Sequence, residues 1–305
     1  MTELLITGAT GFTGSLVCQG LAQTQPGLAA TVLVRPQSDR APLAGLALNL
    51  EYRVGDSAAL STWQSLLAGQ GPATILHLAS IRQVPVLLAA LQGRSCPPRL
   101  IVVGTTGVYS RYNQYAAGYR QIEAQLATYP GSACLLRPTM IYGSVRDKNL
   151  HKLLRFCDRY HCFPVFGSGN SLLQPVHGGD LAQAVVAAYQ RPQVTGAYDL
   201  SGGSVVSFRE LLALVAQLLA KPVIPIPLPL RGSAIAAGLL ERLLGRRSPI
   251  RREQILRLQE DKAYPHEEAR RVLGFAPRAL AAGLREEIAE LRALGLIQPE
   301  PRPPR

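Results

Sequence analysis

The sequence contains no uninterrupted apolar run long enough to cross a membrane. Its most apolar stretch, residues 211–230, is broken by a lysine and four prolines: Lys221, Pro222, Pro225, Pro227 and Pro229. A spanning helix needs about 20 successive apolar residues, and proline interrupts its hydrogen bonds. We read no secretory leader before the first apolar run at Leu4. We therefore expect a cytoplasmic protein without a membrane partner.

Cysteine is scarce and has no paired pattern. The five cysteines are scattered along the chain: Cys18, Cys96, Cys134, Cys157 and Cys162. An odd, scattered set indicates reduced thiols rather than a disulfide framework. Structural zinc sites usually show two closely spaced ligand pairs, and only Cys157 and Cys162, near two histidines, approach that pattern. We expect no metal.

Negative charge is also scarce, since 32 Lys and Arg stand against 20 Asp and Glu, a formal net charge of +12. Such a basic surface binds either nucleic acid or an anionic cofactor and substrate. The sequence contains no nucleic-acid-binding motif. The arginines of its last quarter alternate with glutamates, which is typical of solvated helix faces. We therefore expect a small-molecule substrate and no nucleic-acid partner.

What the sequence does contain is a glycine-rich turn near its start. An apolar run, residues 4–6, leads into Gly8, Gly11 and Gly14, and a helical pattern follows at once. Gly8 permits a sharp turn, Gly11 lets a diphosphate approach the backbone, and Gly14 lets the helix pack on the strand. Free N–H groups at the helix N-terminus complete a phosphate cradle, which predicts a bound dinucleotide. The candidate cofactor contacts here are Gly8, Thr10, Gly11, Phe12, Thr13 and Gly14.

Apolar strands alternate with helical segments through the first half of the chain. This alternation predicts an α/β fold, a doubly wound parallel (Rossmann) sheet with its ligand crevice at the carboxyl ends of the strands. Beyond Pro138 the pattern loosens into a smaller, mainly helical region. We expect residues 1–140 to form the dinucleotide-binding domain. Residues 141–300 are expected to form mostly a C-terminal substrate lobe, interlaced with the first domain.

The residue that follows the second strand selects the cofactor in such folds. An acidic residue there accepts hydrogen bonds from the ribose of NAD, whereas an arginine pairs with the 2′-phosphate of NADP. Arg35 occupies this position, so we favour NADP, with NAD as the alternative. Asp56 ends the third strand and either accepts from the adenine amino group or caps the next helix. Ser57, beside it, is included in the cofactor site.

Later motifs occur in the order of a known family: HLAS at 77–80, GTTGVYS at 104–110, LRPTMIYG at 136–143 and ARRVLGFAPR at 269–278. Together with GATGFTG at 8–14, they make the sequence resemble the extended or atypical short-chain dehydrogenase/reductases, a group that includes the NAD-dependent epimerase/dehydratases. The resemblance implies hydride transfer to or from a nicotinamide. It also implies cofactor contacts at Leu78, Ala79, Ser80 and Pro138.

The same resemblance places the catalytic groups at Thr105 and Tyr115. In the family, a Ser or Thr orients the substrate oxygen and a Tyr acts as acid and base. A Lys four residues after the Tyr supplies the positive charge that a phenol needs to act near neutral pH. Here Tyr119 stands where that lysine belongs, and no lysine occurs between residues 108 and 130.

Two functions stay open at this point. The first is an NAD(P)-dependent oxidoreductase or epimerase/dehydratase-like enzyme that acts on a carbonyl or hydroxyl group, in a nucleotide sugar or a small carbonyl compound. The second is a dinucleotide-binding protein without turnover, a sensor or assembly factor, which the missing lysine favours. Because the family often dimerises through two helices, a homodimer through residues 84–91 and 115–127 is also expected.

Overall fold

We describe the fold from a computed structural model, which describes residues 4–69, 71–147, 149–245 and 251–299. Its centre is a sheet of seven parallel strands in the spatial order β11-β6-β5-β4-β1-β2-β3. The strands are β1 (Leu4–Thr7), β2 (Ala29–Val34), β3 (Asn49–Val54), β4 (Thr74–His77), β5 (Arg99–Val103), β6 (Ala133–Pro138) and β11 (Gly196–Leu200). The order reverses on the two sides of β1, so the doubly wound sheet predicted from the sequence is confirmed.

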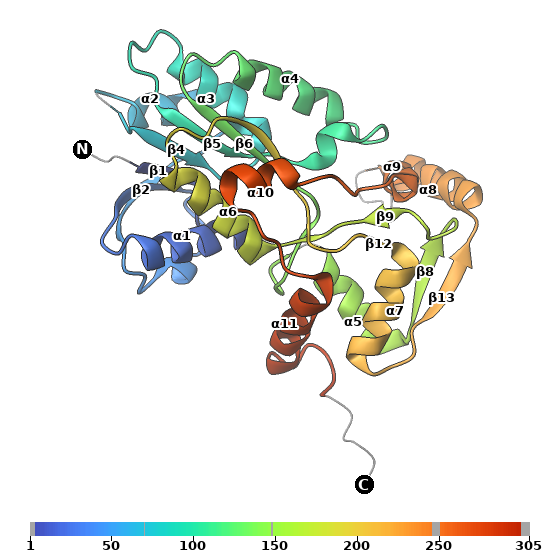
Figure 1. Cartoon of the computed structure of the whole chain (residues 1–305). Coiled ribbons are helices and arrows are strands. Elements are labelled where there is room, and N and C mark those ends of the chain that lie inside the picture. Colours follow the sequence, from blue (N-terminus) through green and yellow to red (C-terminus); the bar gives the residue numbers. More distant parts are fainter. Residues whose placement is uncertain (1–3, 70, 148, 246–250, 300–305) are drawn as a thin grey trace.

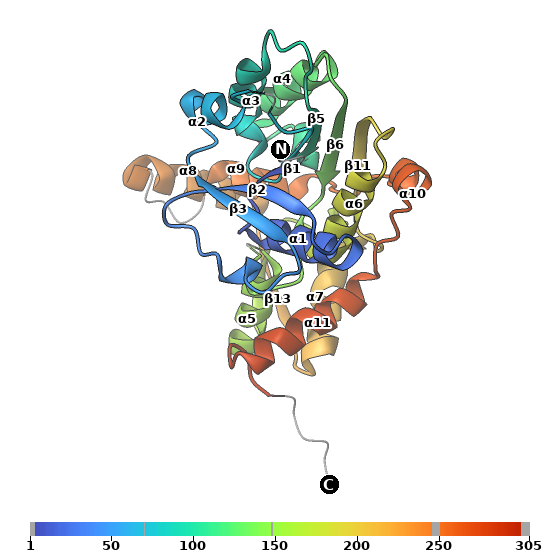
Figure 2. The ribbon, with the colours of Figure 1, turned by 90° about the vertical axis from the view of Figure 1, so that its left-hand side faces the viewer.

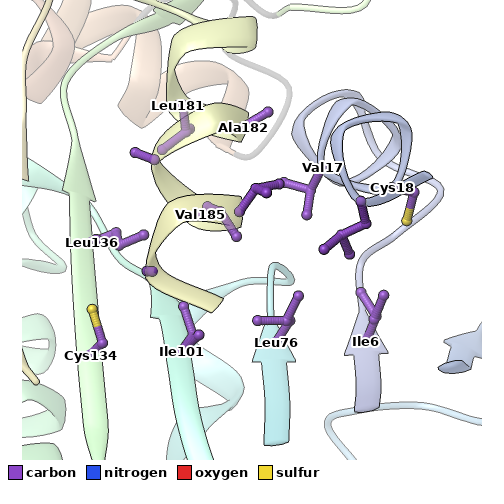
Figure 3. Packing of buried hydrophobic residues seen from close by; sticks show 14 of the residues in the cluster. Ile6, Val17, Cys18, Leu76, Ile101, Cys134, Leu136, Leu181, Ala182 and Val185 are labelled. Atoms are coloured by element: carbon purple, nitrogen blue, oxygen red, sulfur yellow. The ribbon is translucent and has the colours of Figure 1, made fainter. Parts of the chain in front are cut away.

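Helices cover both faces of this sheet (Figures 1 and 2). On one face lie α1 (Phe12–Thr24), α6 (Gly178–Gln190) and α10 (Glu267–Leu273); on the other lie α2 (Leu60–Leu66), α3 (Val84–Leu91) and α4 (Ala116–Ala127). Figure 3 shows Val17 of α1 and Val185 of α6 above strand residues such as Leu76. Side chains buried from water on both faces supply most of the favourable free energy of folding.

A second lobe extends from the carboxyl edge of the sheet (Figure 1). Its elements are β7 (Ile141–Tyr142), α5 (Leu150–Tyr160), β8 (Cys162–Phe166), β9 (Leu172–Leu173), β10 (Val176–His177), β12 (Val206–Ser207), α7 (Phe208–Leu219), β13 (Ile224–Leu228), α8 (Leu230–Leu244), α9 (Arg252–Leu256) and α11 (Leu280–Ala293). Its core is separate and includes the fully buried Leu154, Leu211 and Leu284. The amphipathic α7 begins with a capping box, in which Ser207 and Glu210 bond to each other's backbone N–H.

The chain returns to the sheet after this second lobe has begun. Both α6 and β11 belong to the sheet layers although they follow residue 141, and β11 pairs with β6 in parallel. The sequence analysis did not anticipate β11 or α10. It excluded only a membrane-spanning helix in the proline-rich stretch and did not predict the strand β13 there. That strand lies at the edge of a two-stranded sheet with β8, where proline is tolerated because an edge strand has unpaired positions.

Two observations bear on compartment and membrane. All five cysteines are free thiols, three of them buried: Cys18, Cys134 and Cys157. Of the helices in the described ranges, none combines the length and the apolar character that crossing a bilayer requires.

Candidate cofactor and substrate site

The glycine turn between β1 and α1 has the shape of a diphosphate cradle. Gly8 has a φ of 74°, and a Cβ on it would lie 2.7 Å from the backbone nitrogen of Ala79. A side chain on Gly14 would collide with the carbonyl oxygen of Gly8. At Gly11, by contrast, an added Cβ would meet only the Gly8 carbonyl oxygen, at 3.2 Å, so this side of the turn is open. The residues present therefore fit a dinucleotide diphosphate at the N-terminus of α1.

The other residues predicted in this turn have different surroundings. Phe12 turns its ring toward the start of α6, because a Cβ on Gly178 would lie 2.6 Å from its Cζ. Thr13 is half-buried in the first turn of α1. The carbonyl of Thr10 accepts a hydrogen bond of 2.6 Å from Nη2 of Arg146, and Nη1 of Arg146 donates to the Ser15 hydroxyl at 3.1 Å. An exposed guanidinium from the second lobe thus lies against the phosphate cradle.

The remaining predicted cofactor contacts lie where the parallel strands end, at one edge of the sheet. Arg35 follows β2 and is exposed, and its backbone N–H donates to Ser38. Asp56 follows β3, and its carboxylate accepts from the N–H of Ala58, a turn-forming role that leaves its second oxygen available. Ser57 is buried and donates to the side chain of Gln83 at 2.6 Å.

The strand ends β4 and β6 complete this edge. Leu78 continues β4 by donating from its backbone to Thr7, and Ala79 lies against Gly8. The carbonyl of Ser80 faces Nε2 of His77 at 3.2 Å. Pro138 ends β6, and its carbonyl accepts from the Thr106 hydroxyl at 3.3 Å. The fold therefore brings the predicted cofactor residues to one continuous edge.

His77 is a structural residue of the sheet. It is fully buried, and burial lowers its pKa to about 4, so the ring is neutral. Its Nδ1 lies 3.0 Å from the Thr7 hydroxyl while Nε2 faces the Ser80 carbonyl. Nδ1 thus joins β4 to β1, and Nε2 holds the loop that follows β4.

The two predicted catalytic residues lie in different surroundings. Thr105 follows β5, and its hydroxyl accepts from the N–H of Gly107 at 3.0 Å, which leaves its own proton available for a ligand. It lines the cavity described below. Tyr115 precedes α4, is 43% exposed and is not among the residues that line this cavity. The guanidinium carbon of Arg82 lies 4.8 Å from the centre of its ring.

A second tyrosine near this edge belongs to a charged network. The hydroxyl of Tyr109 donates to Asp199 at 2.9 Å and accepts from Arg137 at 3.2 Å. Burial and the charge of Asp199 raise the pKa of Tyr109 to about 12. Arg137 also makes a two-bond ion pair with Glu123. Tyr109 is therefore held as a neutral phenol that links β6, β11 and α4.

A cavity of about 720 Å³ opens from Thr105 into the second lobe. Most of its surface is apolar and comes from α5, β8, α7 and the segment after α9. The apolar side chains that line it are Met140, Leu150, Leu153, Phe156, Phe163, Pro164, Phe166, Leu173, Phe208, Leu211 and Leu258. Three of the phenylalanines, Phe156, Phe163 and Phe208, pack edge to face, with successive ring centres 5.3 and 5.8 Å apart. Such walls suit an apolar ligand, and the few polar groups between them fix its orientation.

The segment 257–264 supplies polar groups to this cavity that sequence reasoning missed. Glu260 accepts hydrogen bonds from the Ser110 hydroxyl and from the N–H of Arg111, both at 2.6 Å. These bonds join the loop after β5 to the segment 257–264 in the cavity wall. Lys262 is half-buried, and its Nζ donates to the carbonyl of Arg257 at 2.7 Å. Burial, aided by the charge of Arg257, lowers the pKa of Lys262 to about 8. Its only sequence signal is a lone lysine in a loop.

Comparison with known proteins agrees with this geometry. Residues 4–114 match the NAD dependent epimerase/dehydratase family. A ceramide reductase of Caulobacter vibrioides (strain NA1000 / CB15N) is 31% identical over 212 residues, a match that covers 64% of this chain and 63% of that protein. The matched part is thus less than two thirds of the relative's length. The resemblance drawn from the sequence motifs is confirmed.

Solved structures show the same fold at lower identity. The crystal structure of gox2253 has a TM-score of 0.75 at 21% identity, covering 98% of this chain and 100% of that one. A UDP-glucuronic acid 4-epimerase from Bacillus cereus, in complex with NAD, has a TM-score of 0.70 at 17% identity, covering 95% and 99%. At these identities the likeness establishes the architecture alone.

Proposed function

Because residues 4–114 match the NAD dependent epimerase/dehydratase family, we propose that the protein is an NAD(P)-linked oxidoreductase whose substrate joins a carbonyl or hydroxyl group to a long apolar part. The observation that carries this proposal is the cavity that runs from Thr105 between apolar walls. The similarity to a ceramide reductase points the same way. A cytoplasmic location remains part of the proposal.

The polar groups are placed for chemistry at one end of such a substrate. A bound nicotinamide would give or take the hydride. Thr105 would donate its hydroxyl proton to the substrate oxygen, since its lone pair already accepts from Gly107. Lys262 would hold an oxygen of the substrate inside the cavity, because the carbonyl of Arg257 uses only one of its three N–H groups. These contacts would fix the reacting carbon while the apolar part fills the second lobe.

Tyr115 would act as the proton donor and acceptor, with Arg82 in place of the family's lysine. The guanidinium over the Tyr115 ring supplies a fixed positive charge near the phenol. Tyr115 lies outside the cavity lining, so a substrate would have to reach past Thr105 to meet it. We propose NADP over NAD because Arg35 is exposed at the end of β2, where a 2′-phosphate would lie.

The competing function is epimerisation of a nucleotide sugar. Three cations in the cavity lining support it, because a diphosphate would need them: Lys152, Arg257 and Lys262. The four phenylalanines of the cavity lining argue against epimerisation, since a sugar nucleotide has little apolar surface to cover them: Phe156, Phe163, Phe166 and Phe208. Binding of a dinucleotide without turnover is the third possibility, and it predicts cofactor binding with no product from either substrate class.

Oxidation of NADPH by purified protein, with ketones of increasing acyl chain length, tests the proposal. Each methylene that enters the cavity should raise kcat/KM about threefold to fourfold until the cavity is full. Thr105→Val should abolish most turnover, and Thr105→Ser should retain it. UDP-glucose and UDP-glucuronic acid with NAD form the second arm. Turnover of these sugars with none of the ketones would reject the proposal.

A further inference from the structure

The outer face of α8 carries large aliphatic side chains in contact with water. Ile235 is 63% exposed, Leu239 is 55% exposed and Leu243 is 82% exposed. Their spacing of four residues places them along one side of the helix. A soluble surface usually keeps such a side polar, so an aliphatic row of this kind marks a contact surface.

Arginines border this aliphatic row. Arg231 and Arg242 are exposed, and the helical period of 3.6 places both on one flank of the row. Residues 230–257 contain seven arginines against two glutamates. Two of these, Arg246 and Arg247, lie outside the described residues. An aliphatic row flanked by arginine is the pattern of a helix that lies in the interface of an anionic bilayer.

The inner face of α8 packs against residues that line the candidate substrate cavity. Ala234 and Ala237 are buried against Ile255 of α9, and Phe166 packs on this cluster. Phe166 itself lines the cavity. Leu258 lines it too, yet is 40% exposed. One short layer of side chains therefore separates the exposed aliphatic row from the apolar cavity.

The strand before α8 argues against a second copy of the chain as the occupant. Ile224 and Ile226 of β13 are exposed, and β13 leads into α8 on the same side of the molecule (Figure 1). Pro225 and Pro227 remove N–H donors from this edge, which prevents a partner strand from pairing with it. The homodimer expected through α3 and α4 would use another side (Figures 1 and 2).

We propose that α8 lies in the interfacial layer of an anionic membrane and brings the cavity wall at Phe166 and the exposed Leu258 to the bilayer, from which an apolar substrate enters. This inference rests on the proposed function for its substrate, but not for the membrane contact itself. The sequence led us to expect no membrane partner because no segment could span a bilayer. A helix that lies in the interface needs no such segment.

Flotation of the purified full chain with lipid vesicles tests the contact. One set of vesicles contains phosphatidylcholine alone, and the other adds phosphatidylglycerol. We expect binding to the anionic set, weakened by salt. The double variant Leu239→Glu, Leu243→Glu and the variant pair Arg231→Gln, Arg242→Gln should each bind about tenfold or more weakly. Leu294→Glu, which changes a leucine that is 55% exposed at the end of α11, is the matched control and should bind like the natural chain.

The outcomes separate this inference from the proposed function. Absence of vesicle binding by the natural chain, or equal binding by the Leu239 and Leu243 variant, overturns the inference. A concentration-dependent dimer that these substitutions dissolve, without vesicle binding, overturns it in favour of a second copy. Vesicle binding without turnover of any long-chain ketone supports the membrane contact and rejects only the proposed function. If both hold, the double variant should lose turnover of ketone in vesicles and keep turnover of ketone in detergent.

Discussion

The guanidinium of Arg146 lies against the glycine turn, 2.6 Å from the carbonyl oxygen of Thr10. The loop that carries it is fastened to α11, since Ser144 and the N–H of Val145 both donate to Glu290. The second lobe thus delivers a positive charge to the cradle that the first domain forms. The N-terminus of α1 and this arginine together would face the two negative charges of a dinucleotide diphosphate.

Arg146→Gln should therefore weaken cofactor binding about tenfold, because a charge-assisted contact of this kind contributes about 1.5–3 kcal/mol. Titration of the intrinsic or NADPH fluorescence measures the dissociation constant without any turnover. The dissociation constant of Arg146→Lys should lie between those of the natural chain and of Arg146→Gln. The difference between the natural chain and Arg146→Gln should become smaller at high salt. Arg155→Gln, which removes an exposed arginine on α5, is the control. Equal constants for Arg146→Gln and the natural chain would show that this charge does not meet the cofactor.

Arg35→Asp tests the choice between the two cofactors. An aspartate would repel the 2′-phosphate of NADP and could accept from the ribose hydroxyls of NAD. NADP affinity should fall about tenfold or more, and NAD affinity should stay or rise. Arg40, whose guanidinium stacks 4.7 Å from the centre of the Tyr52 ring, provides the control as Arg40→Asp. A parallel loss of both cofactors in Arg35→Asp would refute the assignment of NADP.

Tyr115 and Arg82 are expected to act as one unit. If the phenol transfers the proton, Tyr115→Phe should lower kcat about a hundredfold or more at unchanged cofactor affinity. Arg82→Gln should lower kcat, because the phenol loses the positive charge that lies over its ring. In this background Tyr119→Lys should restore part of the activity. Turnover that survives Tyr115→Phe unchanged would remove this residue from the mechanism, and Tyr109→Phe would then be the next variant to measure.

The sequence predicted best where structure is set locally. The glycine turn follows from steric demands at Gly8 and Gly14, and the mainly helical region expected beyond Pro138 includes the strongly amphipathic α5 and α7. It failed at β11, whose short alternating sequence is a strand only because β6 lies beside it. It also missed Lys262, which reaches the cavity because Glu260 fastens its segment to a loop about 150 residues earlier. The site depends on contacts between residues far apart in the chain, and a local sequence pattern cannot predict such contacts.

Lys262 gives the proposed reaction a specific pH dependence. Burial lowers its pKa to about 8, so the amine is charged below that pH and neutral above it. If the charged amine holds the substrate oxygen, KM should rise as the pH passes from 7 to 9, while kcat changes little. Lys262→Met should show a high KM at all pH values, and Lys262→Arg should keep a low KM up to pH 9. Lys152→Met, which removes another cation from the cavity lining, is the control. If the KM of Lys262→Met still rises near pH 8, the pH dependence does not come from Lys262.

Glu287 links stability to pH through the same loop that carries Arg146. Its side chain is fully buried, accepts from the N–H of Gly143 at 3.1 Å and is close enough to Asp147 to be affected by its charge. Burial, followed by the charge of Asp147, raises its pKa from 4.5 to about 9. The folded state therefore holds a proton between these values that the unfolded state has released. It follows that the free energy of unfolding falls as the pH rises from about 5 to 9.

Glu287→Gln introduces a side chain of the same shape that is neutral at every pH. This variant should remove the fall in the free energy of unfolding between pH 5 and 9. Thermal unfolding should give similar midpoints for the variant and the natural chain near pH 5. Near pH 9 the variant should be more stable by about a few kcal/mol, because the natural chain must then bury a charge or break the contact. Glu286→Gln alters an adjacent, exposed carboxylate and should leave the slope unchanged. Since the loop also positions Arg146, the cofactor affinity of the natural chain should fall together with its stability toward pH 9. If stability depends on pH equally in the natural chain, Glu287→Gln and Glu286→Gln, the proton is held by a group other than Glu287.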